Sequence, residues 1–261
     1  MILWKTYGKI VYVSYFCHDR TILLVGSGQA MVALTSADLK SASLFSCLDI
    51  EQLEQLLSGH RETVLEVGQI VLSEQDWDDS IYFLRSGLAK VRTYSADGDE
   101  VIMCLLGPGD VFGEMAVVER AFRSADVVSL TPLHLVKLRS LPFKDLLRLE
   151  AEFALALARL ESSRLRDLNM RFVLQTADAT TRLLDALSYL ARKTNQYADP
   201  NAIIPPLAQK EIALIAGLSR ETTSRTLGKL RARSTVVVTE EGGFKIADLQ
   251  PLLKRGLLPQ S

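Results

Sequence analysis

The spacing of apolar residues changes once along the chain, near Pro142, and this change most restricts the fold. Before Pro142, six short segments between residues 63 and 138 alternate apolar with polar residues, which is typical of strands that bury one face. Turns containing glycine separate these segments, as in an antiparallel sandwich or barrel. From about residue 143 to residue 175, glycine and proline are absent and apolar residues recur every three or four positions. The sequence therefore predicts a strand-rich unit followed by a helix about 45 Å long.

The long helix is the first indication of a homodimer. A helix of this length in a small protein usually pairs with another helix, most simply its own copy, and packing on the strand-rich unit is the alternative. Its apolar pattern is interrupted at Arg164. A second helix is predicted at 179–193, and Asp49 with Gln52 forms a capping pair typical of a short helix before the strands.

Charge divides the chain at similar places. Residues 41–147 carry seventeen acids and nine bases, a net charge of −8, whereas residues 208–233 carry six bases and two acids, a net charge of +4. The whole chain of 261 residues has a net charge of −1, so only the C-terminal region has the excess that favours phosphate. This length favours two domains. We predict an N-terminal extension of unclear role at 1–40, a strand-rich domain at 41–147, a dimerisation helix at 148–176 and a C-terminal domain at 177–261.

The first thirty residues are apolar but carry no clear targeting signal. Lys5 and Lys9 keep the apolar runs far shorter than a membrane helix, and no cleavage site follows, so neither a membrane span nor a signal peptide is predicted. Gly26 and Gly28 have the spacing of a dinucleotide-binding turn, but Met31 stands where the third glycine belongs. We favour a loose extension or strand here. The alternative is that the residues before Met31 are translated upstream sequence.

Cysteines and histidines are dispersed. The three cysteines lie too far apart for a metal-binding pair and are odd in number, which does not fit a disulfide framework: Cys17, Cys47 and Cys104. A reducing cytoplasm is therefore expected. The three histidines are isolated in the sequence, so each is expected at the surface or in the core rather than at a metal: His18, His60 and His134. No metal site is predicted.

One segment combines residue types that bind a phosphate and a sugar. It contains three glycines, an acid, an arginine and a serine in close spacing: Gly107, Gly109, Gly113, Glu114, Arg123 and Ser124. Glycines allow close approach of backbone N–H groups, and a guanidinium and a hydroxyl bind a phosphodiester. A carboxylate accepts a hydrogen bond from a ribose 2′-hydroxyl. The alternative is that Glu114 and Arg123 merely form an internal ion pair.

Residues 208–230 have the pattern of a helix-turn-helix. Ile212 and Ile215 mark the buried face of a first helix at 208–216, and Gly217 permits the turn. Ser219 caps the second helix. The exposed face at the start of this helix carries residue types that read base edges: Arg220, Glu221, Thr222, Ser224 and Arg225. A solvated charged face is the alternative, and the segment at 236–246 is typical of a two-stranded wing.

At these residues the sequence resembles the Crp/Fnr transcription regulators. The resemblance begins at LFSCLDIEQLEQLL, continues through VGQIVLSEQDWDDSIYFLRSG and the FGEMA and RSA segments, and extends to about Gly243. SRETTSR coincides with the SRETVxR pattern of that family. The resemblance implies an α+β fold: an N-terminal cyclic-nucleotide-binding β-roll, a long dimerisation helix and a C-terminal winged helix-turn-helix.

The resemblance also implies a ligand and residue roles. The effector is cyclic AMP (cAMP), with Arg123 on the cyclic phosphate and Glu114 on the ribose 2′-hydroxyl. A hydroxyl pair on the long helix, Ser162 and Ser163, would lie under the adenine. The implied effector-binding set is Gly113, Glu114, Met115, Arg123, Ser124 and Ser163.

The resemblance implies DNA and protein partners as well. Double-stranded DNA with palindromic TGTGA-like half-sites would be bound by a homodimer, and RNA polymerase is an expected partner. The implied DNA-binding set is Gln209, Ser219, Arg220, Glu221, Thr222, Ser224, Arg225 and Lys229.

Departures from the family pattern leave alternatives open. Gln75 stands where the family usually has a glycine, which affects a turn rather than the pocket. The oxygen-sensing subfamily needs four cysteine ligands, so it is excluded. The same fold with cyclic GMP (cGMP), a cyclic dinucleotide or no effector remains an alternative. A nucleotide-binding enzyme is the alternative of another class, although no motif contains both a nucleophile and a base.

Overall fold

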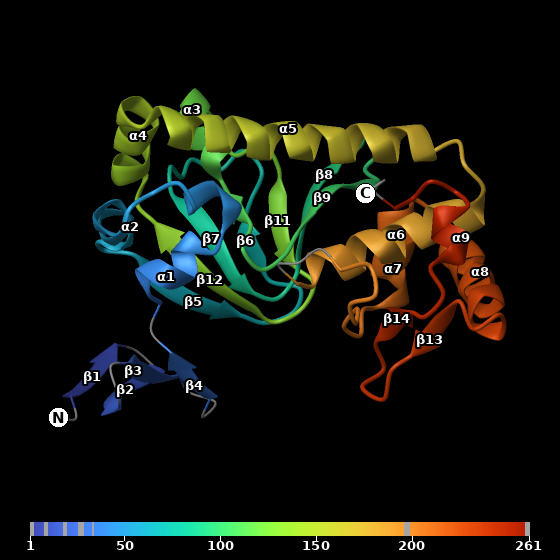
Figure 1. The fold of residues 1–261 in the computed structure, drawn as a ribbon, viewed down its shortest axis with the longest axis horizontal. Helices are drawn as coiled ribbons and strands as arrows, with labels where there is room; N and C mark the ends of the chain where they lie inside the picture. Colours follow the sequence, from blue (N-terminus) through green and yellow to red (C-terminus); the bar gives the residue numbers. More distant parts are fainter. Residues whose placement is uncertain are drawn as a thin grey trace.

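The computed structural model describes most of the chain (Figure 1). Its backbone is described at residues 3–7, 10–17, 20–25, 29–32, 34–195 and 199–258, and its side chains in the last two of these ranges. His18 and the turn from Gly26 to Gly28, for which the sequence analysis made predictions, lie outside the described residues.

The described elements follow one another in the order shown in Figure 1. The helices are α1 (Ser36–Lys40), the 3-10 turn η1 (Ser43–Phe45), α2 (Ile50–Leu57), α3 (Glu114–Glu119), α4 (Ser140–Leu149), α5 (Ala151–Leu174), α6 (Ala179–Lys193), α7 (Gln209–Ala216), α8 (Arg220–Ala232) and α9 (Gln250–Leu253). The strands are β1 (Leu3–Tyr7), β2 (Ile10–Cys17), β3 (Arg20–Val25), β4 (Gln29–Val32), β5 (Arg61–Leu65), β6 (Ile70–Leu72), β7 (Ile81–Ser86), β8 (Ala89–Tyr94), β9 (Glu100–Leu106), β10 (Val111–Phe112), β11 (Asp126–Ser129), β12 (Leu133–Leu138), β13 (Val236–Val238) and β14 (Phe244–Ile246).

Two four-stranded antiparallel sheets form the strand-rich unit, the β-roll. One sheet has the strand order β10, β7, β12, β5, and the other has the order β6, β11, β8, β9. Leu84 and Leu135 of the first sheet pack with Leu106 and Val127 of the second in one buried cluster. All six alternating segments form strands. The first segment contains two strands, β5 and β6, which belong to different sheets. The α+β fold class is thereby confirmed.

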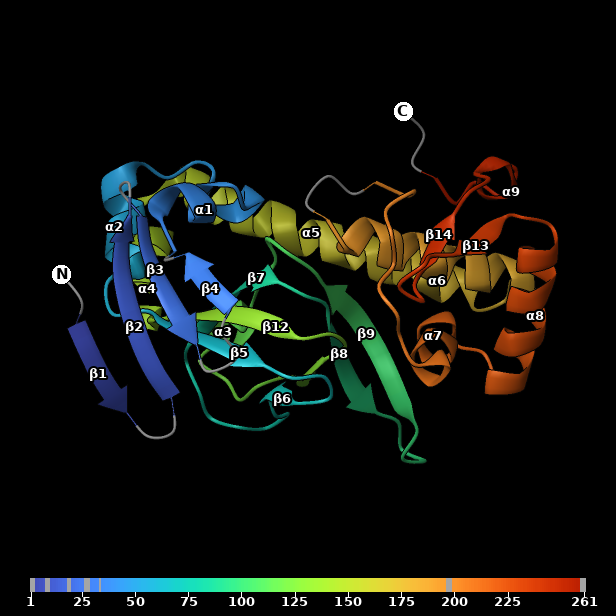
Figure 2. The same ribbon diagram turned by 90° about the horizontal axis from the view of Figure 1, so that it is seen from below.

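The chain before the β-roll contains further structure. Strands β1 to β4 form an antiparallel sheet in sequence order, seen at the N-terminal end in Figure 2. Leu34 and Leu39, which lie just before and within α1, are buried in the same cluster as Phe45 and Phe83. The first packed unit therefore begins before residue 41, the predicted boundary. Asp49 forms the predicted capping pair at the start of α2.

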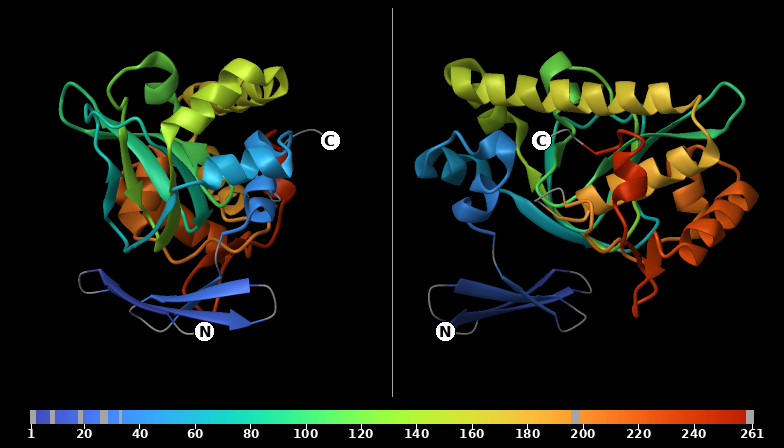
Figure 3. Two further views of the ribbon diagram at one scale, coloured as in Figure 1. Left: turned by 90° about the vertical axis from the view of Figure 1, so that its left-hand side faces the viewer. Right: turned by 45° about the vertical axis from the view of Figure 1, so that its right-hand side comes forward.

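The stretch predicted as one helix of about 45 Å consists of two helices, so that prediction is wrong. α4 ends at Leu149 and α5 begins at Ala151, because Glu150 has an extended backbone with φ −112° and ψ 99°. This break lets the buried rings of Phe143 and Phe153 meet edge to face, with their centroids 5.2 Å apart. α5 alone is about 36 Å long. It is the long helix that spans the β-roll and the C-terminal unit in Figures 1 and 3.

The β-roll and the C-terminal unit share a hydrophobic core. Leu88 and Ile102, from the β8–β9 region, belong to the same buried cluster as Leu187 of α6 and Ile212 of α7. The backbone N–H of Leu105 donates to the buried hydroxyl of Tyr189 on α6 at 3.0 Å. These contacts join the two units through a packed interface rather than through a linker alone.

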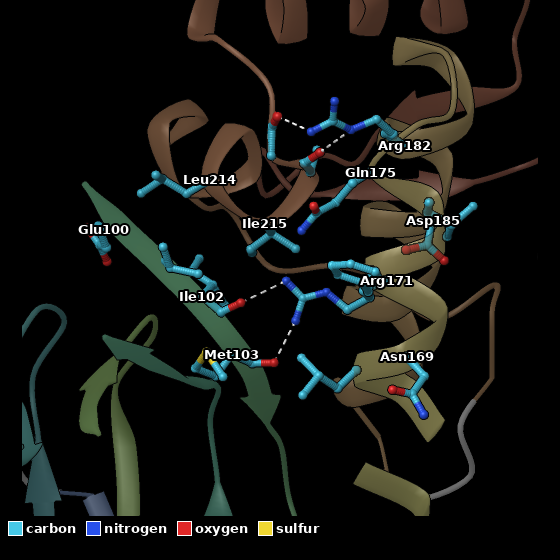
Figure 4. A pocket seen from close by; sticks show the side chains of 16 residues that line it. Glu100, Ile102, Met103, Asn169, Arg171, Gln175, Arg182, Asp185, Leu214 and Ile215 are labelled. Carbon is cyan, nitrogen blue, oxygen red and sulfur yellow. Dashed lines mark hydrogen bonds between the residues drawn. The ribbon is translucent and has the colours of Figure 1, made fainter. Parts of the chain in front are cut away.

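A cavity of about 610 Å³ lies between the units, bounded by the start of β9, the end of α5, and helices α6 and α7 (Figure 4). In this cavity Arg171 of α5 donates to the carbonyl oxygens of Met103 at 2.8 Å and Ile102 at 3.0 Å. Arg182 of α6 donates to the carbonyl oxygen of Ala216 at 3.1 Å. The first arginine ties α5 to β9, and the second ties α6 to the end of α7.

A buried lysine forms an ion pair across the same interface. Lys90 of β8 is 3% exposed, and its Nζ lies 2.7 Å from Glu100 Oε1 of β9 and 2.5 Å from Glu211 Oε2 of α7. A charge so far from water is tolerated only when it is paired. Lys90 therefore links the β-roll directly to the first helix of the helix-turn-helix.

We expect Lys90→Met to lower the free energy of unfolding by about 3 to 5 kcal/mol, because the substitution leaves Glu211 without its cation and Glu100 with only the longer contact to Arg92 at 3.4 Å. Urea denaturation followed by circular dichroism measures the loss. The matched control is Lys210→Met, a neighbouring exposed lysine on α7, which should cost less than about 0.5 kcal/mol. Equal losses in the two variants would contradict a stabilising role for the Lys90 pairs.

Candidate functional site

A cavity of about 410 Å³ lies between the β6–β11–β8–β9 sheet, helix α3 and helix α5. We call it the α3–α5 cavity. It is lined by five of the six residues of the predicted effector set: Gly113, Glu114, Met115, Arg123 and Ser124. These residues come from one short helix and the loop that follows it, because α3 starts at Glu114 and that loop returns the chain to β11.

Gly113 sets the geometry at one end of the cavity. Its φ of 84° lies in the left-handed region, and it caps the N-terminus of α3. A Cβ at this position would lie 2.8 Å from Arg123 Nη1 and 3.0 Å from the carbonyl oxygen of Ser80. Only glycine therefore permits both the turn and the close approach of the arginine.

Arg123 is buried and held by the backbone around it. Nη1 donates to the carbonyl oxygen of Gly113 and Nη2 to that of Ser80, each at 2.7 Å. Nη2 also lies 3.3 Å from Asp78 Oδ2. The Nε of Arg123 is buried without a hydrogen-bond partner among the described residues. The guanidinium is thus fixed in position with one donor unused.

Glu114 is equally buried but has a different partner. Its Oε1 accepts a hydrogen bond from Arg164 Nη1 at 2.8 Å, whereas Oε2 is buried without a partner among the described residues. Burial raises the pKa of Glu114 to about 7, the Arg164 charge opposes this rise, and the negative charge of Glu161 adds to it. The alternative ion pair between Glu114 and Arg123 is not formed.

Arg164 is the residue that the sequence analysis missed. It reaches from α5 to Glu114, to Glu161 Oε1 at 2.9 Å and to the carbonyl oxygen of Val111. The available signal was the interruption of the apolar pattern of the helix at this position. A cation on the face of a helix that packs against a strand-rich unit needs a buried anion as partner.

Ser163, unlike the other five residues of the predicted effector set, does not line the α3–α5 cavity of this chain. The α5 residues that line the cavity follow helical spacing: Glu161, Arg164, Leu165 and Leu168. Ser163 is exposed and lines a different cavity, together with the turn from Gly107 to Asp110. Successive helix residues are about 100° apart, so one position of register moves a side chain off the face. Gly107 and Gly109 are likewise separate from Glu114.

The C-terminal unit contains the predicted helix-turn-helix. α7 and α8 are joined through Gly217, whose φ is 60°, and Ser219 Oγ accepts from the backbone N–H of Thr222 at the start of α8. Ile212 and Ile215, which are expected inside, are buried, and so are Leu227 and Leu230 of α8. Strands β13 and β14 pair antiparallel and form the predicted wing.

Seven of the eight residues of the predicted DNA-binding set are exposed, and Thr222 is half-buried in the helix cap. The charged members, none of which has an ion-pair partner among the described residues, are Arg220, Glu221, Arg225 and Lys229. A recognition helix contacts base edges with the exposed side chains of its first turns. The start of α8 has this arrangement.

The described part of the chain has neither a membrane-spanning helix nor a candidate cluster of metal ligands. No helix there is both long and apolar enough to cross a membrane. Within the same residues, no group of three or more histidine, cysteine, aspartate or glutamate side chains is placed to hold a metal ion.

Two family models match this chain. The cyclic nucleotide-binding domain model matches residues 62–150, which contain the β-roll and α4. The Crp-like helix-turn-helix domain model matches residues 181–255, from α6 to α9. The two models together thus contain the α3–Arg123 segment and the start of α8.

Several known proteins are similar to this chain over most of their own length. The cyclic AMP receptor protein of Thermus thermophilus is 30% identical over 202 residues, which cover 76% of this chain and 89% of that protein. A CRP-like cAMP-activated global transcriptional regulator of Mycobacterium tuberculosis is 25% identical over 219 residues, 83% of this chain and 97% of that protein. The solved structure of FixK2 from Bradyrhizobium japonicum superposes with a TM-score of 0.66 at 17% identity, over 77% of this chain and 98% of that one, and supports the fold.

The two matched domains lie on either side of the long helix α5, and the sequence similarity extends over most of the chain. The chain belongs to the Crp/Fnr family of transcription regulators, with a cyclic nucleotide-binding domain followed by a Crp-like helix-turn-helix.

Proposed function

We propose that this protein is a cAMP-responsive regulator that binds a palindromic DNA site as a homodimer. The observation that carries the proposal is the pair of buried, unpartnered polar atoms in the α3–α5 cavity, Glu114 Oε2 and Arg123 Nε. Leaving such atoms unpaired costs about 1 to 3 kcal/mol each. A ligand with both an acceptor and a donor would satisfy them together.

A 3′,5′-cyclic nucleotide has this chemistry. Its ribose 2′-hydroxyl donates to Glu114, and its cyclic phosphate accepts from Arg123 and from the hydroxyl of Ser124. The two side chains are already buried and oriented, so little ordering is needed on binding. The relatives named above as a cyclic AMP receptor protein and a cAMP-activated regulator support cAMP as the first ligand to test.

Arg164 connects the polar groups of the ligand site to α5. Arg164 holds Glu114 on one side and the carbonyl oxygen of Val111 on the other. A ligand hydroxyl that bonds to Glu114 changes the balance of the Glu114–Arg164 pair. We propose that this change shifts the population of α5 and of the helix-turn-helix beyond it toward the DNA-binding arrangement.

The homodimer is supported by the apolar residues that α5 leaves exposed. Leu165 is 58% exposed, Phe172 71% and Val173 66%. A second copy of α5 would cover such a surface, as in other paired helices. Two recognition helices about one DNA turn apart then bind the two half-sites of a palindrome, with RNA polymerase as a partner in the cytoplasm.

We expect Arg123→Leu to weaken cAMP binding by at least about 2 kcal/mol, about thirtyfold in Kd, because the buried guanidinium is the group that meets the phosphate. Isothermal titration calorimetry on the full chain measures the change. Because Arg123 also holds two carbonyl oxygens, Arg123→Lys provides a milder variant that keeps the charge and should still lose affinity. Arg148→Leu, at an exposed arginine of α4 outside the cavity, is the matched control. Unchanged affinity in both Arg123 variants would refute the assignment.

Glu114→Gln should remove a pH dependence of stability. Because the folded-state pKa of Glu114 is raised to about 7, folding takes up a proton between about pH 4.5 and 7, and the wild-type chain loses stability as the pH rises through this window. The amide cannot titrate, so the variant should have the flatter profile in urea denaturation from pH 5 to pH 8. Glu119→Gln, at an exposed carboxylate at the end of α3, should keep the wild-type slope. Parallel profiles for wild type and Glu114→Gln would contradict the prediction.

Arg220→Ala should reduce the preference for a TGTGA-like palindrome over scrambled DNA by about 1 to 3 kcal/mol while leaving non-specific binding in place. Arg231→Ala, at an exposed arginine near the end of α8, should instead weaken binding to both DNAs alike and lower the salt slope by about one. Gel-shift titrations at several salt concentrations separate the two effects. If Arg220→Ala lowers affinity for both DNAs equally, α8 does not read bases.

A further inference from the structure

Two loops meet at Arg123, on the wall of the α3–α5 cavity. The β6–β7 loop comprises residues 73–80, and the α3–β11 loop comprises residues 120–125. The backbone N–H of Arg123 donates to the carbonyl oxygen of Asp76 at 3.0 Å, and the backbone N–H of Gln75 donates to the carbonyl oxygen of Arg123 at 2.8 Å. The two loops are therefore joined through the backbone of Arg123.

The β6–β7 loop also orients the guanidinium of Arg123. Its Nη2 donates to the carbonyl oxygen of Ser80 at 2.7 Å and lies 3.3 Å from Asp78 Oδ2. The Asp78 carboxylate is itself held by the backbone N–H of Ser80 and the hydroxyl of Tyr82, each at 2.9 Å. A displacement of this loop would therefore move the groups that orient Arg123.

Each of the two loops contains a strained backbone. Gln75 has a φ of 68° and Arg120 a φ of 55°, both in the left-handed region that residues other than glycine rarely adopt. Such conformations persist only where the surrounding contacts hold them in place. Gln75 lies two residues before Trp77, and Arg120 lies two residues before Phe122. The same part of each loop thus carries a strained residue and an aromatic side chain.

The two aromatic side chains pack on each other and join the loops a second time. The rings of Trp77 and Phe122 meet edge to face, with their centroids 5.3 Å apart. Such a pair stabilises a contact beyond the burial of its surface. Trp77 lies between Asp76 and Asp78 in the sequence, and Phe122 directly precedes the arginine. Neither aromatic residue lines the α3–α5 cavity, so the pair holds the loops without facing a ligand.

We propose that Trp77 and Phe122 are positioning residues for the ligand, because their contact closes the two loops around Arg123 and keeps its guanidinium in the orientation that receives the cyclic phosphate. The inference rests on the proposed function. Without the aromatic contact, the strained loops spend part of their time in other arrangements. The apparent affinity then falls with the fraction of molecules whose loops remain closed.

Calorimetric titration of the full chain with cAMP tests the proposal. Trp77→Ala and Phe122→Ala should each raise Kd by about threefold to tenfold, which corresponds to the loss of one aromatic contact. Trp77→Phe keeps a ring against Phe122 and should stay within about twofold of wild type. Leu149→Ala, at a leucine of α4 that is 79% exposed and lies outside both loops and the cavity, is the matched control and should leave Kd unchanged. Urea denaturation establishes that each variant is folded.

The outcomes separate this proposal from the function on which it rests. If wild type binds cAMP and both folded alanine variants bind it equally well, the aromatic pair does not position Arg123, and the proposed function stands. If wild type does not bind cAMP, the proposed function itself fails.

A double-mutant cycle tests whether the aromatic pair acts through the guanidinium. Arg123→Lys keeps the positive charge but removes the forked donors that the β6–β7 loop orients. In the Arg123→Lys background, Trp77→Ala should therefore raise Kd by less than about twofold. An equal fold-change in the wild-type and Arg123→Lys backgrounds means that Trp77 acts independently of the guanidinium, and overturns the inference.

Discussion

The arrangement of the sensing half depends on a buried carboxylate and the cation that reaches it from another helix. Glu114 lies in the first turn of α3, which follows the left-handed backbone conformation that only a glycine at position 113 permits. Arg164 reaches from α5 and donates a hydrogen bond to Glu114. Without Arg164, burial of Glu114 would favour the neutral acid even more strongly. Without Glu114, Arg164 would keep its hydrogen bond to the carbonyl oxygen of Val111 but lose its anionic partner on α3. The same contact therefore positions the ligand-binding groups and fixes the helix that leads to the DNA-binding unit.

Features set by local sequence could be predicted. The alternation of residues in β7, β8, β9, β11 and β12 is a property of single strands, and the caps at Asp49 and Ser219 depend on residues three positions away. The helix-turn-helix has buried positions at helical spacing and a glycine with positive φ between its helices. The grouping of Glu114 and Arg123 in one site could also be predicted, because both lie in one compact segment of the chain.

Features set by distant packing could not be predicted. Neither glycine nor proline lies near Glu150 to signal the helix break, and the contact that the break permits, between the rings of Phe143 and Phe153, joins two different helices. The resemblance alone places Ser163 in the effector set, and it does not fix which face of α5 a residue occupies, since one position of register rotates a side chain by about 100°. The Lys90–Glu211 pair joins residues 121 positions apart, and no local pattern announces such a contact.

The shared core has a consequence for how this protein can be recombined. Leu88 and Ile102 of the β-roll are buried against α6 and α7, so these side chains belong to the hydrophobic core of the C-terminal unit as well. A C-terminal unit taken from a related regulator would pack against apolar side chains that do not match its own surface. Chimaeras that exchange only the region after α5 would carry mismatched interiors unless the residues of the β-roll that face α6 and α7 are exchanged with it. The part that can be exchanged between such proteins is therefore the C-terminal unit together with the residues that it packs against, and not the C-terminal unit alone.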